Sequence, residues 1–135
     1  MYLLDTDVLS ELVKRRPSPH VLARLRRSRA DTLYTTVISV MELRYGCARR
    51  PDSERFWARL EREILARVQV LGFGADDAIV AGDLLAALST KGTRIGLEDT
   101  LIASVALVRR YVVVTRNVRH FARISSLRVE NWFEP

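Results

Sequence analysis

Four oxygen-bearing side chains stand at positions where short apolar or β-branched segments end or helices begin. Asp5 directly follows an apolar run, Glu42 lies about one turn beyond a Thr-rich segment, Asp99 is in the first turn of a predicted helix, and Asn117 follows a β-branched run. Ligands of open parallel sheets gather outside the carboxyl ends of the strands, so we expect these side chains to share one rim. Neighbouring carboxylates repel unless a cation binds between them, and oxygen-only ligation suits Mg²⁺ or Mn²⁺.

Each of these residues also has a purely structural interpretation. Asp5 can cap the helix that follows it, although its place directly behind a buried strand favours a site. Glu42 is the third residue after Ser39, so a capping box explains it equally well. Asp99 complements the positive end of a helix dipole, and Asn117 can simply belong to a turn.

The elements that must position these residues follow from hydrophobic periodicity. Strands are predicted at 2–4, 32–38, 68–71, 111–115 and 127–132. Helices are predicted at 8–13, 18–27, 39–48, 51–67, 75–89 and 97–110. In the last helix the inner face is predicted to hold Leu101, Ile102, Val105 and Val108. Strands separated by helices of this length indicate βαβ crossovers, hence an α/β fold with a mostly parallel central sheet between two helical layers.

Length and composition exclude several classes of protein. The 135 residues suit a single domain spanning 1–135, and the 48% hydrophobic and 28% charged residues exclude disorder and low complexity. Cys47 is the lone cysteine, so an oxidised, disulfide-bonded protein is not indicated. We find no secretory signal and no apolar run long enough for a membrane span, which predicts a cytoplasmic protein. His20 and His120 are too isolated for a structural zinc site.

The net charge of +6 is unevenly distributed. All but Lys14 and Lys91 of the 22 basic residues are arginine, and residues 15–50 hold nine arginines against two acids. Residues 109–128 hold six arginines and no acid. Arginine binds phosphate bidentately, so these segments suit a nucleic acid or an acidic protein partner. Arginine-rich usage on solvated helix faces explains any single arginine equally well.

The segment Leu3-Leu4-Asp5-Thr6-Asp7-Val8-Leu9 partly resembles the Asp-x-Asp-x-Val/Thr motif of haloacid dehalogenase-like phosphatases. That resemblance implies Asp5 as a covalent nucleophile, but Leu9 stands where Val or Thr belongs, and Lys91 is the sole candidate for the required lysine.

Four segments in order along the chain resemble the motif regions of PIN-domain proteins, in particular VapC-type toxins. They are residues 2–10 (YLLDTDVLS), 38–46 (ISVMELRYG), 97–104 (LEDTLIAS) and 114–121 (VTRNVRHF). The resemblance implies a Mg²⁺- or Mn²⁺-dependent endoribonuclease, the toxin of a type II toxin–antitoxin pair inhibited by a VapB-like antitoxin. It further implies a homodimer, capable of a larger toxin–antitoxin assembly, with an antitoxin groove formed by part of residues 9–67.

The resemblance also assigns roles to individual residues. Asp5, Glu42 and Asp99 match the acidic metal-binding positions of the family, with Asp5 and Asp99 holding the ion and Glu42 completing its shell or positioning water. Arg44 and Arg116 would hold flanking phosphates of the RNA.

At the fourth motif this chain departs from the common pattern. Thr115 matches the small hydroxyl residue, Asn117 falls where members carry Asp or Asn, and His120 falls where many carry Asp before Phe. Asp7 adds a charge where members often carry Asn. An amide oxygen can still bind a hard cation or orient water, so Asn117 is retained as a catalytic candidate. The alternative is a catalytically impaired PIN module that binds RNA or protein and cleaves nothing.

Overall fold

The computed structural model describes residues 1–135 and contains one five-stranded, all-parallel sheet in the order β3-β2-β1-β4-β5. The strands are β1 (Tyr2–Leu4), β2 (Leu33–Thr36), β3 (Gln69–Leu71), β4 (Val112–Val114) and β5 (Val129–Glu130). The helices are α1 (Thr6–Glu11), α2 (Pro19–Arg27), α3 (Val37–Ala48), α4 (Ser53–Glu63), α5 (Ala75–Thr90), α6 (Leu97–Arg109) and α7 (Val118–Phe121). Two 3₁₀ turns lie at Ala30–Thr32 and Leu65–Arg67.

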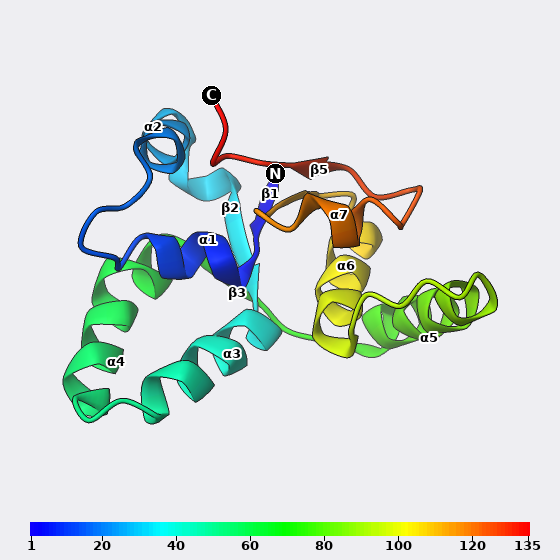
Figure 1. The fold of residues 1–135 in the computed structure, drawn as a ribbon, viewed down its shortest axis with the longest axis horizontal. Helices are drawn as coiled ribbons and strands as arrows, with labels where there is room; N and C mark the ends of the chain where they lie inside the picture. Colours follow the sequence, from blue (N-terminus) through cyan, green and yellow to red (C-terminus); the bar gives the residue numbers. More distant parts are fainter.

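Helices cover both faces of the sheet, which confirms the predicted three-layer α/β/α architecture. Figure 1 shows α1, α2 and α4 on one side of the strands and α5, α6 and α7 on the other. No helix combines the length and the hydropathy needed to cross a membrane.

Successive side chains of the central strands belong alternately to two separate hydrophobic cores, one on each face of the sheet. Leu3 and Val113 pack into the core beneath α5 and α6, whereas Leu4 and Val114 pack into the core beneath α1, α2 and α4. All four are fully buried. The two-residue period of a strand produces this division, and burial on both faces explains why β1 and β4 read as unbroken apolar runs.

The junction between β2 and α3 differs from the sequence prediction. The strand ends at Thr36 rather than at residue 38, and the Thr36 hydroxyl caps α3 by accepting a hydrogen bond from the Ser39 amide at 3.1 Å. The predicted capping box from Ser39 to Glu42 is therefore wrong, because Ser39 is already inside the helix. The Val and Ile at 37 and 38 looked like strand residues, but the threonine cap ends the strand before them.

Two further predictions need correction. The helix predicted over 51–67 ends at Glu63 and continues only as the turn Leu65–Arg67. Val108 was predicted on the inner face of α6, yet it is 38% exposed. By contrast, the predicted start of α2 is confirmed, with Ser18 as the cap and Pro19 in the first turn.

Candidate active site

The parallel topology brings three chain segments to one rim of the sheet. Asp5 follows β1, Thr115 follows the neighbouring β4, and the first turns of α3 follow β2 on the other side. The backbone amide of Asp5 donates to the Val114 carbonyl at 2.9 Å, so the ends of β1 and β4 stay aligned up to the rim. The rim is where the rule for parallel sheets predicts a ligand site.

Asp5 is a buried carboxylate without a cationic partner. It is 6% exposed, accepts hydrogen bonds from the Thr6 amide and the Thr115 hydroxyl, both at 2.8 Å, and forms no ion pair. Burial, and after it the charge of Asp7, raises the pKa of Asp5 to about 7. Asp5 therefore caps α1 and also carries a charge that its surroundings do not neutralise.

Asp7 adds to this negative charge. Its Oδ2 accepts from the Arg116 amide at 3.0 Å and lies 3.3 Å from the Thr115 hydroxyl, while its Oδ1 is buried with no hydrogen-bond partner. Burial raises the pKa of Asp7 above its ordinary value. A buried, unpartnered carboxylate oxygen is costly, and a bound cation would remove that cost.

Glu42 faces the same rim from α3. The Thr6 hydroxyl donates to Glu42 Oε1 at 2.6 Å and lies 2.9 Å from the Ser39 hydroxyl. Burial raises the pKa of Glu42 above its ordinary value, although the hydrogen bond from Thr6 acts to lower it. The charge of Asp99 raises the pKa further. Since Thr36 caps the helix, the structural explanation for Glu42 is lost, and its position toward Thr6 points to a role at the rim.

Asp99 lies in the first turn of α6 and faces the turn after β4. Asp99 Oδ2 is 3.2 Å from Nδ1 of His120, and the same ring nitrogen is 2.8 Å from Nδ2 of Asn117. The backbone amide of Asn117 in turn donates to the Thr115 hydroxyl at 2.9 Å. Asp99 and Asn117 therefore contact each other through His120, the residue that falls where many family members carry Asp.

The four predicted site residues belong to one hydrogen-bonded network. It runs from Glu42 through Thr6, Asp5, Thr115, Asn117 and His120 to Asp99. In this conformation no three acidic, histidine or cysteine side chains converge on a single ion position. The acids share a rim and act on one another electrostatically, but each is held by its own polar neighbour.

The residues at the rim fit a hard divalent cation. The donors are carboxylate oxygens, the pKa values of Asp5, Asp7 and Glu42 are raised, and one buried oxygen has no partner. Mg²⁺ and Mn²⁺ bind through a few carboxylates and keep several waters, so they need no complete protein cage.

Sequence reasoning missed some residues that hold this network in place. Thr6 joins Asp5 to Glu42, and Ser39 lies beside Thr6. Spacing offers one signal for Ser39, because it stands three residues before Glu42 and so on the same face of a helix. Local spacing does not link His120 to Asp99 across 21 residues, and only the resemblance had placed His120 in the fourth motif.

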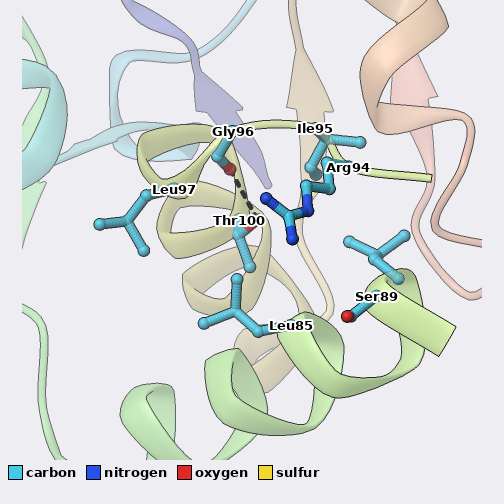
Figure 2. A pocket seen from close by; sticks show the side chains of 8 residues that line it. Leu85, Ser89, Arg94, Ile95, Gly96, Leu97 and Thr100 are labelled. Carbon is cyan, nitrogen blue, oxygen red and sulfur yellow. Dashed lines mark hydrogen bonds between the residues drawn. The ribbon is translucent and has the colours of Figure 1, made fainter. Parts of the chain in front are cut away.

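Two hollows are lined in part by helices that also carry rim residues. A cavity of about 650 Å³ between α1, α3 and α4 has Thr6 and Glu42 in its wall together with four basic side chains: Lys14, Arg15, Arg50 and Arg59. A smaller hollow of about 360 Å³ lies between α5 and the start of α6 (Figure 2). Leu85, Leu97 and Arg94 line it, and the Thr100 hydroxyl donates to the Gly96 carbonyl there. The smaller hollow contains no carboxylate, so the chemistry of the rim is absent from it.

Fold and sequence together define the class of protein. Residues 2–127 match the family model described as PIN domain, and the chain belongs to that family. The predicted family is thus confirmed, and the haloacid dehalogenase-like alternative is not supported.

Individual relatives are similar over nearly their whole length. The chain is 39% identical to "VapC ribonuclease Y4jK" of Sinorhizobium fredii, with 100% of this chain and 99% of that protein covered. It is 35% identical to "tRNA(fMet)-specific endonuclease VapC" of Salmonella typhimurium, with 97% of each covered. Among solved structures, VapBC2 from Rickettsia felis bound to a promoter DNA fragment matches with a TM-score of 0.89 and 31% identity, covering 97% of this chain and 98% of that one.

Proposed function

We propose that this protein is an endoribonuclease of the VapC type, the toxin of a VapBC-like toxin–antitoxin pair, which hydrolyses RNA phosphodiester bonds. The observation that carries the proposal is the group of carboxylates at the rim, the buried Asp5 and the partly buried Asp7 and Glu42, which have raised pKa values and form no ion pair. Relatives named as ribonucleases, identical at 30–39% of positions over nearly all of this chain, support RNA as the substrate.

Asp5, Glu42 and Asp99 would hold a Mg²⁺ or Mn²⁺ ion, with the Asn117 amide as a further oxygen ligand or water-orienting group. When bound, such an ion lowers the pKa of a coordinated water and neutralises charge that develops on a scissile phosphate.

The protein side chains fix the geometry of this site. Thr115 and the Thr6 amide orient the two Asp5 oxygens, and the Thr6 hydroxyl aims Glu42 toward the rim. Preorganised oxygens lose little freedom when the site is filled, which favours binding and positions water for attack.

Basic side chains beside the rim would hold the RNA backbone. The cavity next to Glu42 is lined by Lys14, Arg15, Arg50 and Arg59. Lys14, Arg50 and Arg59 also pair with Glu11, Asp52 and Glu63, so RNA phosphates would compete with these acids for them. Arg44, predicted from the resemblance to hold phosphate, is exposed and lies over the Trp57 ring at 5.0 Å. Arg116 lies over the Phe133 ring at 3.8 Å and contacts Glu11, so its guanidinium is partly engaged by the protein itself.

The proposed partner is a VapB-like antitoxin. The solved VapBC2 complex from Rickettsia felis supports this assignment, because its VapBC2 chain matches this chain over almost the whole of both. We further propose that residues 1–135 act as a single domain, as a homodimer and in the cytoplasm.

The test is cleavage of cellular RNA by metal-stripped protein, with and without Mn²⁺ or Mg²⁺, followed by mapping of new RNA ends. We expect discrete cuts that require both the metal and Asp99. The transfer RNA tRNA(fMet) is included as a defined substrate because two relatives are named for it. Asp99→Asn should abolish the cuts. Asp83→Asn, which changes an exposed acid in the middle of α5, should cut like the wild type.

Equal cleavage by Asp99→Asn at equal protein concentration would contradict the proposed site. Absence of cleavage with any metal, together with RNA binding that EDTA does not change, would instead indicate a PIN module that binds without cutting.

A further inference from the structure

The side chain of His120 lies within contact distance of a proposed metal ligand. It belongs to the short helix α7, which packs beside α6 (Figure 1), and its Nδ1 is 3.2 Å from Oδ2 of Asp99. The His120 and Asp99 side chains are 42% and 23% exposed. An ion arriving from solvent can therefore reach both atoms.

The contacts of this ring nitrogen depend on which groups carry the hydrogens. As placed, Asn117 Nδ2 donates to Nδ1 at 2.8 Å, so Nδ1 accepts there and carries no proton for Asp99. If the Asn117 amide is turned over, its oxygen takes that place and Nδ1 stands between two oxygen acceptors. In the first arrangement the Asp99 oxygen faces the ring nitrogen with no proton between them, and in the second a proton on Nδ1 lies between Nδ1 and its oxygen neighbours. A cation bound to both Nδ1 and Oδ2 would occupy the position of that proton.

The spacing of these atoms suits two ligands of one ion. Neighbouring ligands at right angles, each about 2.1 Å from a metal, are separated by about 3.0 Å. The 3.2 Å between Nδ1 and Oδ2 is close to that separation. A hydrogen bond would give a similar distance, so chemistry at the nitrogen must distinguish the two cases.

We infer that His120 is a nitrogen ligand of the cation held by Asp99, and that the site therefore prefers Mn²⁺ to Mg²⁺. Mg²⁺ is bound in proteins almost entirely through oxygen, whereas first-row transition ions accept imidazole readily. This inference rests on the proposed function, because it takes Asp99 to be a metal ligand. It goes further by adding a ligand from α7 and by naming the ion that the site selects.

Electron spin-echo spectroscopy of the Mn²⁺-loaded protein tests the inference without measuring catalysis. A directly bound imidazole gives ¹⁴N modulation in the Mn²⁺ signal, and the chain has only two histidines. His20 is exposed on α2 and supplies the matched control. We expect ¹⁴N modulation in the wild type and in His20→Asn, and its loss in His120→Asn.

Competition between the two ions gives a second readout. In His120→Asp, which replaces the nitrogen with a carboxylate oxygen, we expect the preference for Mn²⁺ over Mg²⁺ to fall about tenfold, measured from free Mn²⁺ by spin resonance. His20→Asp should leave the preference unchanged.

The outcomes separate this inference from the proposed function. Tight Mn²⁺ binding that needs Asp99 but shows no ¹⁴N modulation would overturn the role of His120 and leave the nuclease proposal standing. Modulation that persists in His120→Asn would also overturn it. If Mn²⁺ does not bind at all, both the inference and the metal site in the proposed function fail.

Discussion

The two ends of helix α1 treat a buried carboxylate in opposite ways. At its start, Asp5 is 6% exposed and has no cationic partner, and burial raises its pKa to about 7. At its end, Glu11 is 4% exposed but accepts from Lys14 at 2.9 Å and from the Ser18 amide at 2.8 Å. Burial on its own would raise the pKa of Glu11, yet these contacts lower it below its ordinary value.

The difference lies in what covers each carboxylate. The side chains around Glu11 include its own cationic partners, Lys14 and, at 3.4 Å, Arg116, whereas Asp5 lies between the ends of two strands. Asp77 resembles Glu11, since it is 2% exposed and pairs with Arg109 at 2.8 Å. A chain rich in arginine thus neutralises its buried structural acids and leaves those of the rim available for a cation.

Substitution at the two ends of α1 should separate activity from stability. We expect Asp5→Asn to lower RNA cleavage about a thousandfold, because a carboxylate that holds the cation is lost while its shape remains. Glu11→Gln should lose stability through its ion pairs yet cleave RNA within about threefold of the wild type when folded. Cleavage assays paired with circular dichroism measure both effects. If Glu11→Gln lost as much activity as Asp5→Asn, the contrast between the two ends would disappear.

The carboxylate of Asp77, which Arg109 neutralises, should destabilise the folded protein once Arg109 is removed. Arg109→Met leaves a buried carboxylate without a cation, and we expect a loss of about 3 kcal/mol in the free energy of unfolding. Adding Asp77→Asn should restore most of that loss, because an amide oxygen can still accept from the Gly74 amide. Urea unfolding measures these changes, with Arg59→Met as the control for a solvent-accessible ion pair, expected to cost less than about 0.5 kcal/mol. A full-sized loss that persists in the double variant would show that the charge of Asp77 is not its cause.

The stability of the metal-free protein should depend on pH because of the burial of Asp5. A pKa raised from 3.8 to about 7 means that the folded chain holds this proton more tightly than the unfolded chain. The stability that the protonated Asp5 carboxyl contributes to the folded protein is therefore fully present below about pH 4. It is lost as the pH rises to about 7 and Asp5 ionises in the folded protein.

Asp5→Asn removes that titration. We expect it to raise the free energy of unfolding of the metal-free protein by about 2 kcal/mol at pH 8 and to leave it unchanged at pH 4. The gain is smaller than the shift in the pKa of Asp5 corresponds to, because the new amide cannot accept from Thr115 in the same way. Urea unfolding in EDTA at the two pH values measures the effect. An equal change at both pH values would contradict an unneutralised Asp5.

Much of this arrangement could be predicted from local patterns. An apolar strand that ends in Asp5, a Ser-Pro start for α2 and β-branched runs at β2 and β4 each reflect a local physical preference. Because parallel strands carry their carboxyl ends to one edge, those elements were enough to place Asp5, Asp99 and Asn117 near one another.

The remaining features depend on contacts that no local pattern encodes. Both Thr36 and Ser39 are residue types that cap helices, and the cap falls at Thr36, where β2 ends. One of the basic side chains that pair with Glu11 is that of Arg116, 105 residues away in the sequence. The contact of His120 with Asp99 depends on how α7 packs.

The central claim, that the rim acids are left unneutralised for a divalent cation, is tested most directly by thermal unfolding of metal-free protein at pH 8 during titration with Mn²⁺. We predict a saturable rise of about 5–10 °C in the Tm of the wild type and of Asp83→Asn, and no such rise in Asp5→Asn or Asp99→Asn. A wild type that Mn²⁺ does not stabilise, or an Asp5→Asn variant stabilised as much as the wild type, would contradict the claim.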